Sequence, residues 1–192
     1  MAQGIILAGG YSSRIGHNKM TLSYQGTPII LHCIHSMMPF VSHIFVISGH
    51  YHDELTQLLK DDPKVTIIYN ELYHLGMFSS VKKGSLFVTE DFFIIPGDYP
   101  LIMQSTYLAL LKCKEPIAVP VFQNKKGHPI FIKKELIEAL RNEPLDSNLK
   151  LFRNRFQFAE IQVDDSGILL DIDTLEDHEH LITIKGVNQN GN

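Results

Sequence analysis

The loop that follows the first apolar stretch of the chain has the composition of a phosphate-binding site. After the apolar run 5–8, residues 9–19 contain three glycines, two serines and the cations Arg14 and Lys19. Glycine lets consecutive backbone N–H groups approach one polyanion, and the two cations add charge that amides cannot supply. These features predict a site for the phosphates of a nucleoside triphosphate, whereas Gly9 and Gly10 alone would equally fit an ordinary turn.

This loop matches neither of the two common nucleotide-binding fingerprints. Dinucleotide-binding loops need the spacing Gly-x-Gly-x-x-Gly, and Walker loops end in Gly-Lys followed by Ser or Thr. The run from Gly9 to Lys19 supplies neither pattern. We therefore do not expect an ordinary kinase or dehydrogenase.

Asp98 is a candidate ligand for a magnesium ion. It follows the apolar run 92–95 and lies within the stiff turn 96–100, which contains two prolines and a glycine. Mg²⁺ prefers one or two carboxylates together with phosphate and water, so Asp98 could bridge the ion to a triphosphate. An aspartate in a plain turn would have the same surroundings.

Two later aspartates offer a second ligand. Asp171 and Asp173 would share one face of an extended segment, and either could reach the same ion. The alternative is that Asp173 and Thr174 cap a final helix, whose first turn is acidic. Both interpretations can hold for different carboxylates.

Two polar segments are candidates for binding the reactants. Segment 76–84 places Ser79 and Ser80 in the first turn of an expected helix, where free N–H groups can meet a base edge or a phosphate. Ser79 alone would also fit a helix cap. Segment 127–129 is a tight element between two expected strands, and its His128 could either contact a second substrate or face solvent.

The histidines and cysteines form no clear metal-binding pattern. The two His-x-His pairs, at 50–52 and 178–180, have a spacing that points side chains apart on a helix, and no cysteine lies near either pair. Zinc is therefore disfavoured. Cys33 and Cys113 are too isolated for a disulfide framework, and we expect both to be reduced and half-buried.

Strands that alternate with helices would position these residues. Apolar runs and turn signals predict strands at 5–8, 43–48, 65–69, 92–95, 117–121, 129–132 and 156–163, a short extended piece at 169–173, and helices at 29–38, 53–60, 78–87, 105–111, 134–141 and 175–184. We expect Thr27 to cap the first helix, with Pro28 at its first position. The alternation predicts an α/β fold: a three-layer α/β/α, Rossmann-like domain with a mostly parallel central sheet. Ligands gather at the carboxyl ends of such strands, which is where the first loop and Asp98 fall.

Composition limits the classes of partner. The net charge of −4 and the pI near 6.2 argue against binding to nucleic acid or to an anionic membrane, so any phosphate site must be locally basic. No leader segment and no apolar run of membrane-spanning length is recognisable, and we expect a soluble cytoplasmic protein. We expect one domain over residues 1–185 and a frayed polar tail over 186–192.

Taken together, five segments resemble the molybdenum cofactor nucleotidyltransferases, and most closely the cytidylyltransferases among them. These segments are 7–16 with Lys19, 76–84, 97–100, 127–129 and 171–177, and they follow one another in the family's order. The first loop alone would also match sugar-phosphate nucleotidyltransferases. The order of all five is far more specific than any one of them.

The resemblance implies a reaction and its reactants. A terminal phosphate of molybdopterin would attack the α-phosphorus of CTP, which joins CMP to the cofactor and releases pyrophosphate. A molybdoenzyme would then receive the cofactor. Because this nucleophile is already anionic, the site has to position it and neutralise charge rather than supply a general base.

The resemblance also implies a role for each candidate residue. Arg14 and Lys19 would stabilise the charge that develops on the α-phosphate and on pyrophosphate, and Asp98 with Asp173 would bind Mg²⁺. Gly127, His128 and Pro129 would lie toward the pterin. The nucleotide would contact Leu7, Ala8, Gly9, Gly10, Tyr11, Ser12, Ser13, Arg14, Lys19, Gly76, Ser79 and Ser80.

Two positions depart from the cytidylyl pattern. Gly9 replaces an alanine and is more usual in guanylyl members, so GTP is the alternative nucleotide. Leu175 replaces a proline that would serve only as a helix start. Two other functions stay open: nucleotidyl transfer to a sugar or polyol phosphate, and a non-catalytic chaperone that binds and delivers the cofactor.

Overall fold

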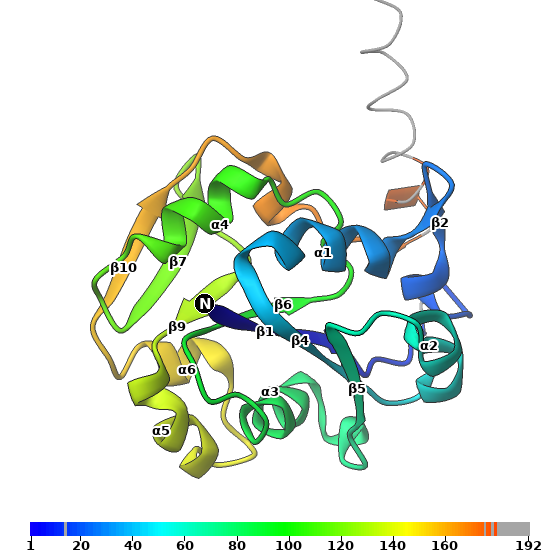
Figure 1. Ribbon diagram of the computed structural model, residues 1–192, viewed down its shortest axis with the longest axis horizontal. Helices are drawn as coiled ribbons and strands as arrows, with labels where there is room; N and C mark the ends of the chain where they lie inside the picture. Colours follow the sequence, from blue (N-terminus) through cyan, green and yellow to red (C-terminus); the bar gives the residue numbers. More distant parts are fainter. Residues whose placement is uncertain (14, 175, 178, 180–192) are drawn as a thin grey trace, which may run out of the picture.

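A central sheet organises the chain, in a computed structural model that describes residues 1–13, 15–174, 176, 177 and 179. Its eight strands follow the order β10-β7-β9-β6-β1-β4-β5, with β8 paired to β7 (Figure 1). The pairs β1/β4, β1/β6, β4/β5 and β7/β10 are parallel, whereas β8 and β9 run antiparallel to their neighbours. The strands are β1 (Ala2–Ala8), β4 (Val41–Ser48), β5 (Val65–Tyr69), β6 (Phe92–Pro96), β7 (Ile117–Phe122), β8 (Lys125–Lys126), β9 (Ile130–Ile132) and β10 (Phe158–Gln162), with a separate hairpin of β2 (Ser23–Tyr24) and β3 (Thr27–Pro28).

Helices cover both faces of this sheet. Figure 1 shows α1, α2 and α4 apart from α3, α5 and α6, and each group shares its own apolar core with the sheet. The central strand β1 serves both cores, because Ile6 and Ala8 join one and Ile5 and Leu7 join the other. The predicted three-layer α/β/α fold with a mostly parallel sheet is therefore confirmed. The α-helices are α1 (Ile29–Met37), α2 (His52–Leu59), α3 (Met77–Ser85), α4 (Gln104–Leu111), α5 (Ile137–Asn142) and α6 (Leu149–Arg153), and the 3-10 helices are η1 (Lys19–Thr21), η2 (Met38–Phe40), η3 (Tyr73–Leu75), η4 (Lys134–Leu136) and η5 (Ser166–Leu169).

None of the helices in the described ranges has both the length and the apolar character needed to cross a membrane. Helix α2 is amphipathic: it buries Leu55 and Leu59 and begins with the acidic Asp53 and Glu54. Such helices pack one apolar face on the sheet.

The register of β1 and β6 brings the two key loops together. Leu7 near the end of β1 pairs with Pro96 at the end of β6, and the strands are parallel. The backbone N–H of Gly97 also donates to the carbonyl of Leu7 at 2.9 Å. Both chains therefore leave the sheet at the same edge, so the prediction that the first loop and Asp98 share one rim is confirmed.

The start of α1 differs from the prediction. Thr27 pairs with Tyr24 across the tight turn of Gln25 and Gly26, whose φ angles are 52° and 79°. This hairpin holds Thr27 in an extended strand, and Pro28 becomes the capping residue, without a side-chain hydrogen bond. The predicted Thr27 cap was wrong because pairing with the preceding strand took precedence over capping.

The last part of the described chain also differs from the prediction. The expected extended piece at 169–173 begins inside η5, and residues 170–173 have no regular structure. Asp165 accounts for the 3-10 helix at this place. It caps η5, because its Oδ1 accepts from the Gly167 N–H at 2.9 Å. The predicted helix 175–184 falls mostly outside the described residues, and the tail 186–192 falls wholly outside them.

The two cysteines are free thiols in different surroundings. Cys33 in α1 is fully buried at 0% exposure, and burial raises the pKa of its thiol well above its usual range. Cys113 is half-buried, as predicted. The prediction was wrong for Cys33, because that residue lies on the face of α1 that packs into the core.

Candidate active site

The loop after β1 folds back on itself. The backbone N–H groups of Ile15 and Gly16 both donate to the carbonyl of Ser12 at 3.0 Å, and the Ser12 hydroxyl accepts from the Lys19 N–H at 3.2 Å. These bonds hold the start of η1 close to the end of β1. Arg14 falls outside the described residues, so its predicted role stays a prediction.

Lys19 reaches across to two aspartates. Its ammonium lies 2.5 Å from Asp98 Oδ2 and 2.9 Å from Asp173 Oδ1. Burial lowers the pKa of Lys19, but the two carboxylates outweigh burial and hold that pKa above its ordinary value. Burial raises the pKa of Asp98, and the ammonium opposes that rise. Lys19 is therefore a cation at neutral pH, held between two acidic side chains.

Three carboxylates lie close together at this site, and two of them contact the Lys19 ammonium. Asp98, Asp171 and Asp173 each offer one oxygen, and these oxygens all lie within 4.8 Å of one another. Within the described part of the chain, Oδ1 of Asp98 is buried and has no hydrogen-bond partner. A buried carboxylate oxygen without a donor is costly, and a set of carboxylate oxygens is what Mg²⁺ prefers. The donor set therefore fits a hard divalent cation.

The chain after Asp173 is held by a reciprocal cap. Asp177 Oδ2 accepts from the backbone N–H groups of Asp173 at 3.0 Å and of Thr174 at 2.8 Å, while the Thr174 hydroxyl accepts from the Asp177 N–H at 3.1 Å. This is a capping box. Thr174 and Asp177 therefore do the capping, while the Asp173 carboxylate contacts Lys19. The interpretation as a helix cap thus applies to Asp177, and the interpretation as a candidate metal ligand applies to Asp173.

A cavity of about 380 Å³ lies in front of Lys19 and Asp98. Its walls come from the first loop, from η3 and from the start of α3. Ser12 and Ser13 line an adjoining hollow of about 270 Å³, whereas Ala8 and Ser79 line neither space. The cavity brings together these predicted nucleotide contacts: Leu7, Gly9, Gly10, Tyr11, Lys19, Gly76 and Ser80.

Asn70, which sequence reasoning missed, positions the predicted serines. It is buried just after β5, and its Nδ2 donates to Ser79 Oγ at 2.9 Å and to Ser80 Oγ at 3.0 Å. Its Oδ1 accepts from the Leu72 N–H at 3.1 Å. A Cβ at Gly9 would lie 3.1 Å from Ser80 Oγ, so the glycine lets the first loop pack against this network. The signal in the sequence was a polar residue at the carboxyl end of a strand.

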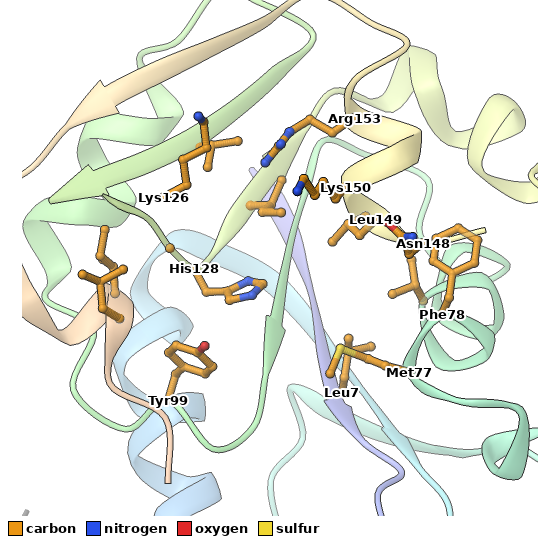
Figure 2. A pocket seen from close by; sticks show the side chains of 16 residues that line it. Leu7, Met77, Phe78, Tyr99, Lys126, His128, Asn148, Leu149, Lys150 and Arg153 are labelled. Carbon is orange, nitrogen blue, oxygen red and sulfur yellow. The ribbon is translucent and has the colours of Figure 1, made fainter. Parts of the chain in front are cut away.

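A second cavity of about 360 Å³ adjoins the first, and Leu7 and Met77 line both. Figure 2 shows the imidazole of His128 in its centre, with the Tyr99 ring beside it. The two ring centroids are 5.0 Å apart. Burial lowers the pKa of His128 to about 4, so the ring is neutral at physiological pH. The alternative in which His128 faces solvent was wrong, because the side chain turns inward.

The rest of segment 127–129 supports this orientation. Gly127 also lines the second cavity, and a Cβ there would lie 2.2 Å from the Ile168 carbonyl oxygen. The His128 N–H donates to the same oxygen at 3.0 Å. Pro129 is buried and does not line the cavity. Only Gly127 and His128 of the three predicted residues therefore reach the space.

Helix α6 forms a wall of the second cavity that sequence reasoning missed. Asn148 caps this helix by accepting from the Leu151 N–H at 2.9 Å. Lys150 and Arg153 from α6, together with Lys126 from β8, bring positive charge to the cavity (Figure 2). A helix of five residues carries too little periodicity to be recognised, and the Asn cap was its one signal.

Comparison with known proteins identifies the family. Residues 4–159 match the model of the MobA-like NTP transferase domain. The chain belongs to this family. The MobA-like chain is therefore a nucleotidyltransferase, and the predicted membership in the molybdenum cofactor nucleotidyltransferases is confirmed.

Named relatives of this MobA-like chain include both base specificities. A molybdenum cofactor cytidylyltransferase of Escherichia coli K12 is 29% identical over 175 residues, 90% of this chain and 91% of the relative. A probable molybdenum cofactor guanylyltransferase of Bacillus cereus ATCC 10987 is 30% identical over 150 residues, 73% and 74% of the two chains. Among solved structures, Rv0371c from Mycobacterium tuberculosis H37Rv superposes with a TM-score of 0.81 at 20% identity, over 95% of this chain and 98% of the other, which shows a shared fold.

Proposed function

We propose that this chain is a Mg²⁺-dependent cytidylyltransferase that transfers CMP from CTP to the terminal phosphate of molybdopterin, releases pyrophosphate and passes the product to a molybdoenzyme. One observation carries the proposal. The Lys19 ammonium and the carboxylate trio of Asp98, Asp171 and Asp173 lie beside the first cavity, of about 380 Å³, which we call the nucleotide cavity. The second cavity adjoins it. Attack on an α-phosphate needs both reactants to meet at such a charged junction.

The first loop and Lys19 would hold the triphosphate. Backbone N–H groups between Gly9 and Ser13 would bind its oxygens, and Lys19, with Arg14, would neutralise charge on the α-phosphate and on the leaving pyrophosphate. The attacking phosphate is already ionised, so no general base is required. Placement of two anions against each other is then the main task of the site.

Asp98 and Asp173 would hold the magnesium ion, with Asp171 as a further ligand. The buried and unpartnered Oδ1 of Asp98 supports this assignment, since it offers a lone pair to a cation. When bound, Mg²⁺ would supply the charge neutralisation and phosphate orientation that lysine alone does not.

The base would lie near Ser80, which Asn70 orients. Asn70 donates to the Ser80 oxygen, which leaves the Ser80 hydroxyl hydrogen available to an acceptor on the base. Cytosine and guanine both carry such acceptors, and the relatives include both types. GTP is therefore the second candidate, and it is favoured by Gly9, the form more usual in guanylyl members.

Pyrophosphate release tests the proposal. The protein is incubated with Mg²⁺ and either CTP or GTP, together with molybdopterin, a sugar phosphate or no acceptor. We expect release that needs both CTP and molybdopterin. Release that requires a sugar phosphate instead would reject the cofactor as acceptor, and faster release with GTP would reject the cytidylyl assignment. Binding of molybdopterin without any release of pyrophosphate would instead support a non-catalytic chaperone that binds and delivers the cofactor.

A further inference from the structure

His128 has one ring nitrogen without a partner inside the second cavity. Figure 2 shows its imidazole at the centre of this cavity, and among the described residues nothing forms a hydrogen bond with its buried Nδ1. A buried polar atom that lacks a partner is costly, and in a native site it calls for a water molecule, an ion or a bound ligand. The second cavity is the space from which such a partner can come.

The other ring nitrogen decides what Nδ1 can do. The imidazole forms a hydrogen bond with the backbone of Ile94, and this bond raises the pKa of His128, so the backbone group is the carbonyl, which accepts. Since Nδ1 has no partner, the donor in this bond is Nε2–H. Burial keeps the ring neutral, and a neutral imidazole has only one N–H. Nδ1 is therefore a lone-pair acceptor.

The imidazole is also held in place by its neighbours. The backbone N–H of His128 donates to the Ile168 carbonyl at 3.0 Å, and the Gly127 N–H donates to the Pro120 carbonyl at 3.0 Å. The Tyr99 ring packs edge-on against the imidazole at an interplanar angle of 65°. Such a preorganised acceptor loses little entropy on binding, and it rejects ligands that leave it unpaired.

The lining of the cavity favours a heterocycle as the donor to Nδ1. Val119, Ile130 and Ile168 contribute apolar lining. A water molecule would need about two to four polar partners, which these side chains do not supply, and a polyol would leave hydroxyl groups unpaired against them. A flat ring with N–H groups on one edge satisfies Nδ1 and buries its faces against apolar side chains.

The position of His128 also suits the proposed reaction. Asp98 lines the nucleotide cavity, and the next residue, Tyr99, lines the second cavity. A phosphate held near Asp98 can therefore belong to a molecule whose ring lies beside Tyr99 and His128. The ring of the acceptor and its reacting phosphate would then occupy adjoining spaces.

We infer that His128 determines specificity for the acceptor, because its Nδ1 accepts a hydrogen bond from the edge of the pterin that carries the 2-amino group and N3–H. The donors on this edge are present in every oxidation state of the pterin ring. The inference rests on the proposed function for the identity of the acceptor. It adds the atom and the polarity by which the ring of the acceptor is recognised.

A matched pair of pterins tests this contact without any turnover. Pterin carries N–H hydrogens on this edge, and methyl groups replace all of them in 2-dimethylamino-3-methylpterin. Dissociation constants are measured at pH 7 by isothermal titration calorimetry for the wild-type protein, His128→Phe, His128→Asn and the control His35→Phe. His35 is exposed on α1 and lines neither cavity.

We expect the wild-type protein to bind pterin about fivefold more tightly than the methylated pterin, which is the size of one neutral hydrogen bond. His128→Phe keeps a ring but has no acceptor, so it should lose this preference while its affinity for the methylated pterin stays the same. His128→Asn should keep the preference, because its Oδ1 can take the place of Nδ1. His35→Phe should behave as the wild-type protein does.

Two results would overturn the inference. The same preference in His128→Phe would show that the methyl groups act through their bulk, and no preference in the wild-type protein would show that the ring does not meet Nδ1. A histidine that only packs in the cavity would change both affinities together when it is replaced. A pterin preference without transfer from CTP would uphold the His128 contact and reject the proposed function, whereas transfer to molybdopterin without the preference would do the reverse.

A measurement on the wild-type protein covers the case in which His128→Phe does not fold. In ¹⁵N NMR spectra of protein with labelled histidines, the resonance of an imidazole nitrogen that accepts a hydrogen bond moves upfield. We expect pterin to move the Nδ1 resonance of His128 in this way and the methylated pterin to leave it in place. An Nδ1 resonance that responds equally to both ligands would overturn the inference.

Discussion

Lys19 connects the candidate metal ligands to the nucleotide cavity. Its ammonium contacts Asp98 and Asp173, and the same residue lines the cavity between the first loop and α3. A charge at this position can stabilise negative charge that develops on phosphate, and preorganised charges of this kind are worth several kcal/mol to a rate. The contribution of Lys19 should therefore be catalytic more than structural.

Replacing Lys19 should show this directly. Lys19→Met keeps the length of the side chain but removes the charge, and we expect kcat/KM for pyrophosphate release to fall about a hundredfold or more. The control is Lys64→Met, because Lys64 is exposed before β5 and lines neither cavity. An unchanged kcat/KM in Lys19→Met would contradict the role given to this ammonium.

His128 should make the stability of the protein depend on pH. Burial lowers its pKa from 6.5 to about 4, so the unfolded chain binds more protons than the folded chain between these values. Stability should then fall as the pH drops from about 7 toward about 4, by up to about 3 kcal/mol, and level off below. Urea unfolding at pH 7 and pH 4.5 should show a smaller loss in His128→Asn. The same pH dependence in both proteins would show that His128 is not the group responsible.

At the scale of elements, the second cavity depends on close backbone contact between segment 127–129 and η5. A Cβ at Gly127 would lie 2.2 Å from the Ile168 carbonyl oxygen, which is backbone and cannot turn aside. By contrast, nothing lies within 4 Å of a Cβ built at Gly10. Close packing therefore requires a glycine at position 127, whereas the space around position 10 would also accept a larger side chain.

Alanine substitutions at the two glycines measure that requirement. We expect Gly127→Ala to lower the free energy of unfolding by about 2–3 kcal/mol, the cost of forcing extra volume into a packed site. Gly10→Ala should change it by less than about 0.5 kcal/mol. Urea denaturation of both variants is the measurement. Equal stability of the two variants would mean that η5 moves freely away from Gly127.

The long elements were predictable from the sequence, and the short ones were not. Strand β5 at 65–69 was predicted with its observed bounds, and β4, α3 and α4 were located to within two residues, because apolar runs of this length have a clear period. Strands of two residues, such as β2 and β8, have no period to detect. Such strands form where they pair with a neighbouring strand. Thr27, for example, was predicted to cap α1 but instead pairs with Tyr24.

At the scale of the whole molecule, the site forms where segments distant in sequence meet at one edge of the sheet. The sequence identified Lys19, Asp98 and Asp173 because their types and turns fit phosphate and metal chemistry. Asn70 and Arg153 were missed, since an asparagine or arginine has no special meaning until burial and neighbours are known. The local basicity expected of a phosphate site is not seen among the described residues around Lys19, where three carboxylates lie beside one ammonium.

Removing divalent cations should stop turnover and leave the fold intact. The carboxylate trio would lack the proposed ion in EDTA, yet Lys19 would still form its ion pairs with Asp98 and Asp173. We expect pyrophosphate release to fall to background in EDTA and to return with excess Mg²⁺, while the thermal midpoint changes by only a few degrees. Full activity in EDTA would contradict a metal-dependent site.

The position of a label in the products tests the central claim most directly. CTP labelled with ³²P at either the α- or the γ-phosphorus is incubated with the protein, Mg²⁺ and molybdopterin, and the products are separated. We predict that the α-label enters the cofactor, that the γ-label appears in pyrophosphate, and that equimolar unlabelled GTP competes weakly. Transfer of the γ-label to the cofactor, or an α-label that never reaches it, would contradict nucleotidyl transfer to molybdopterin.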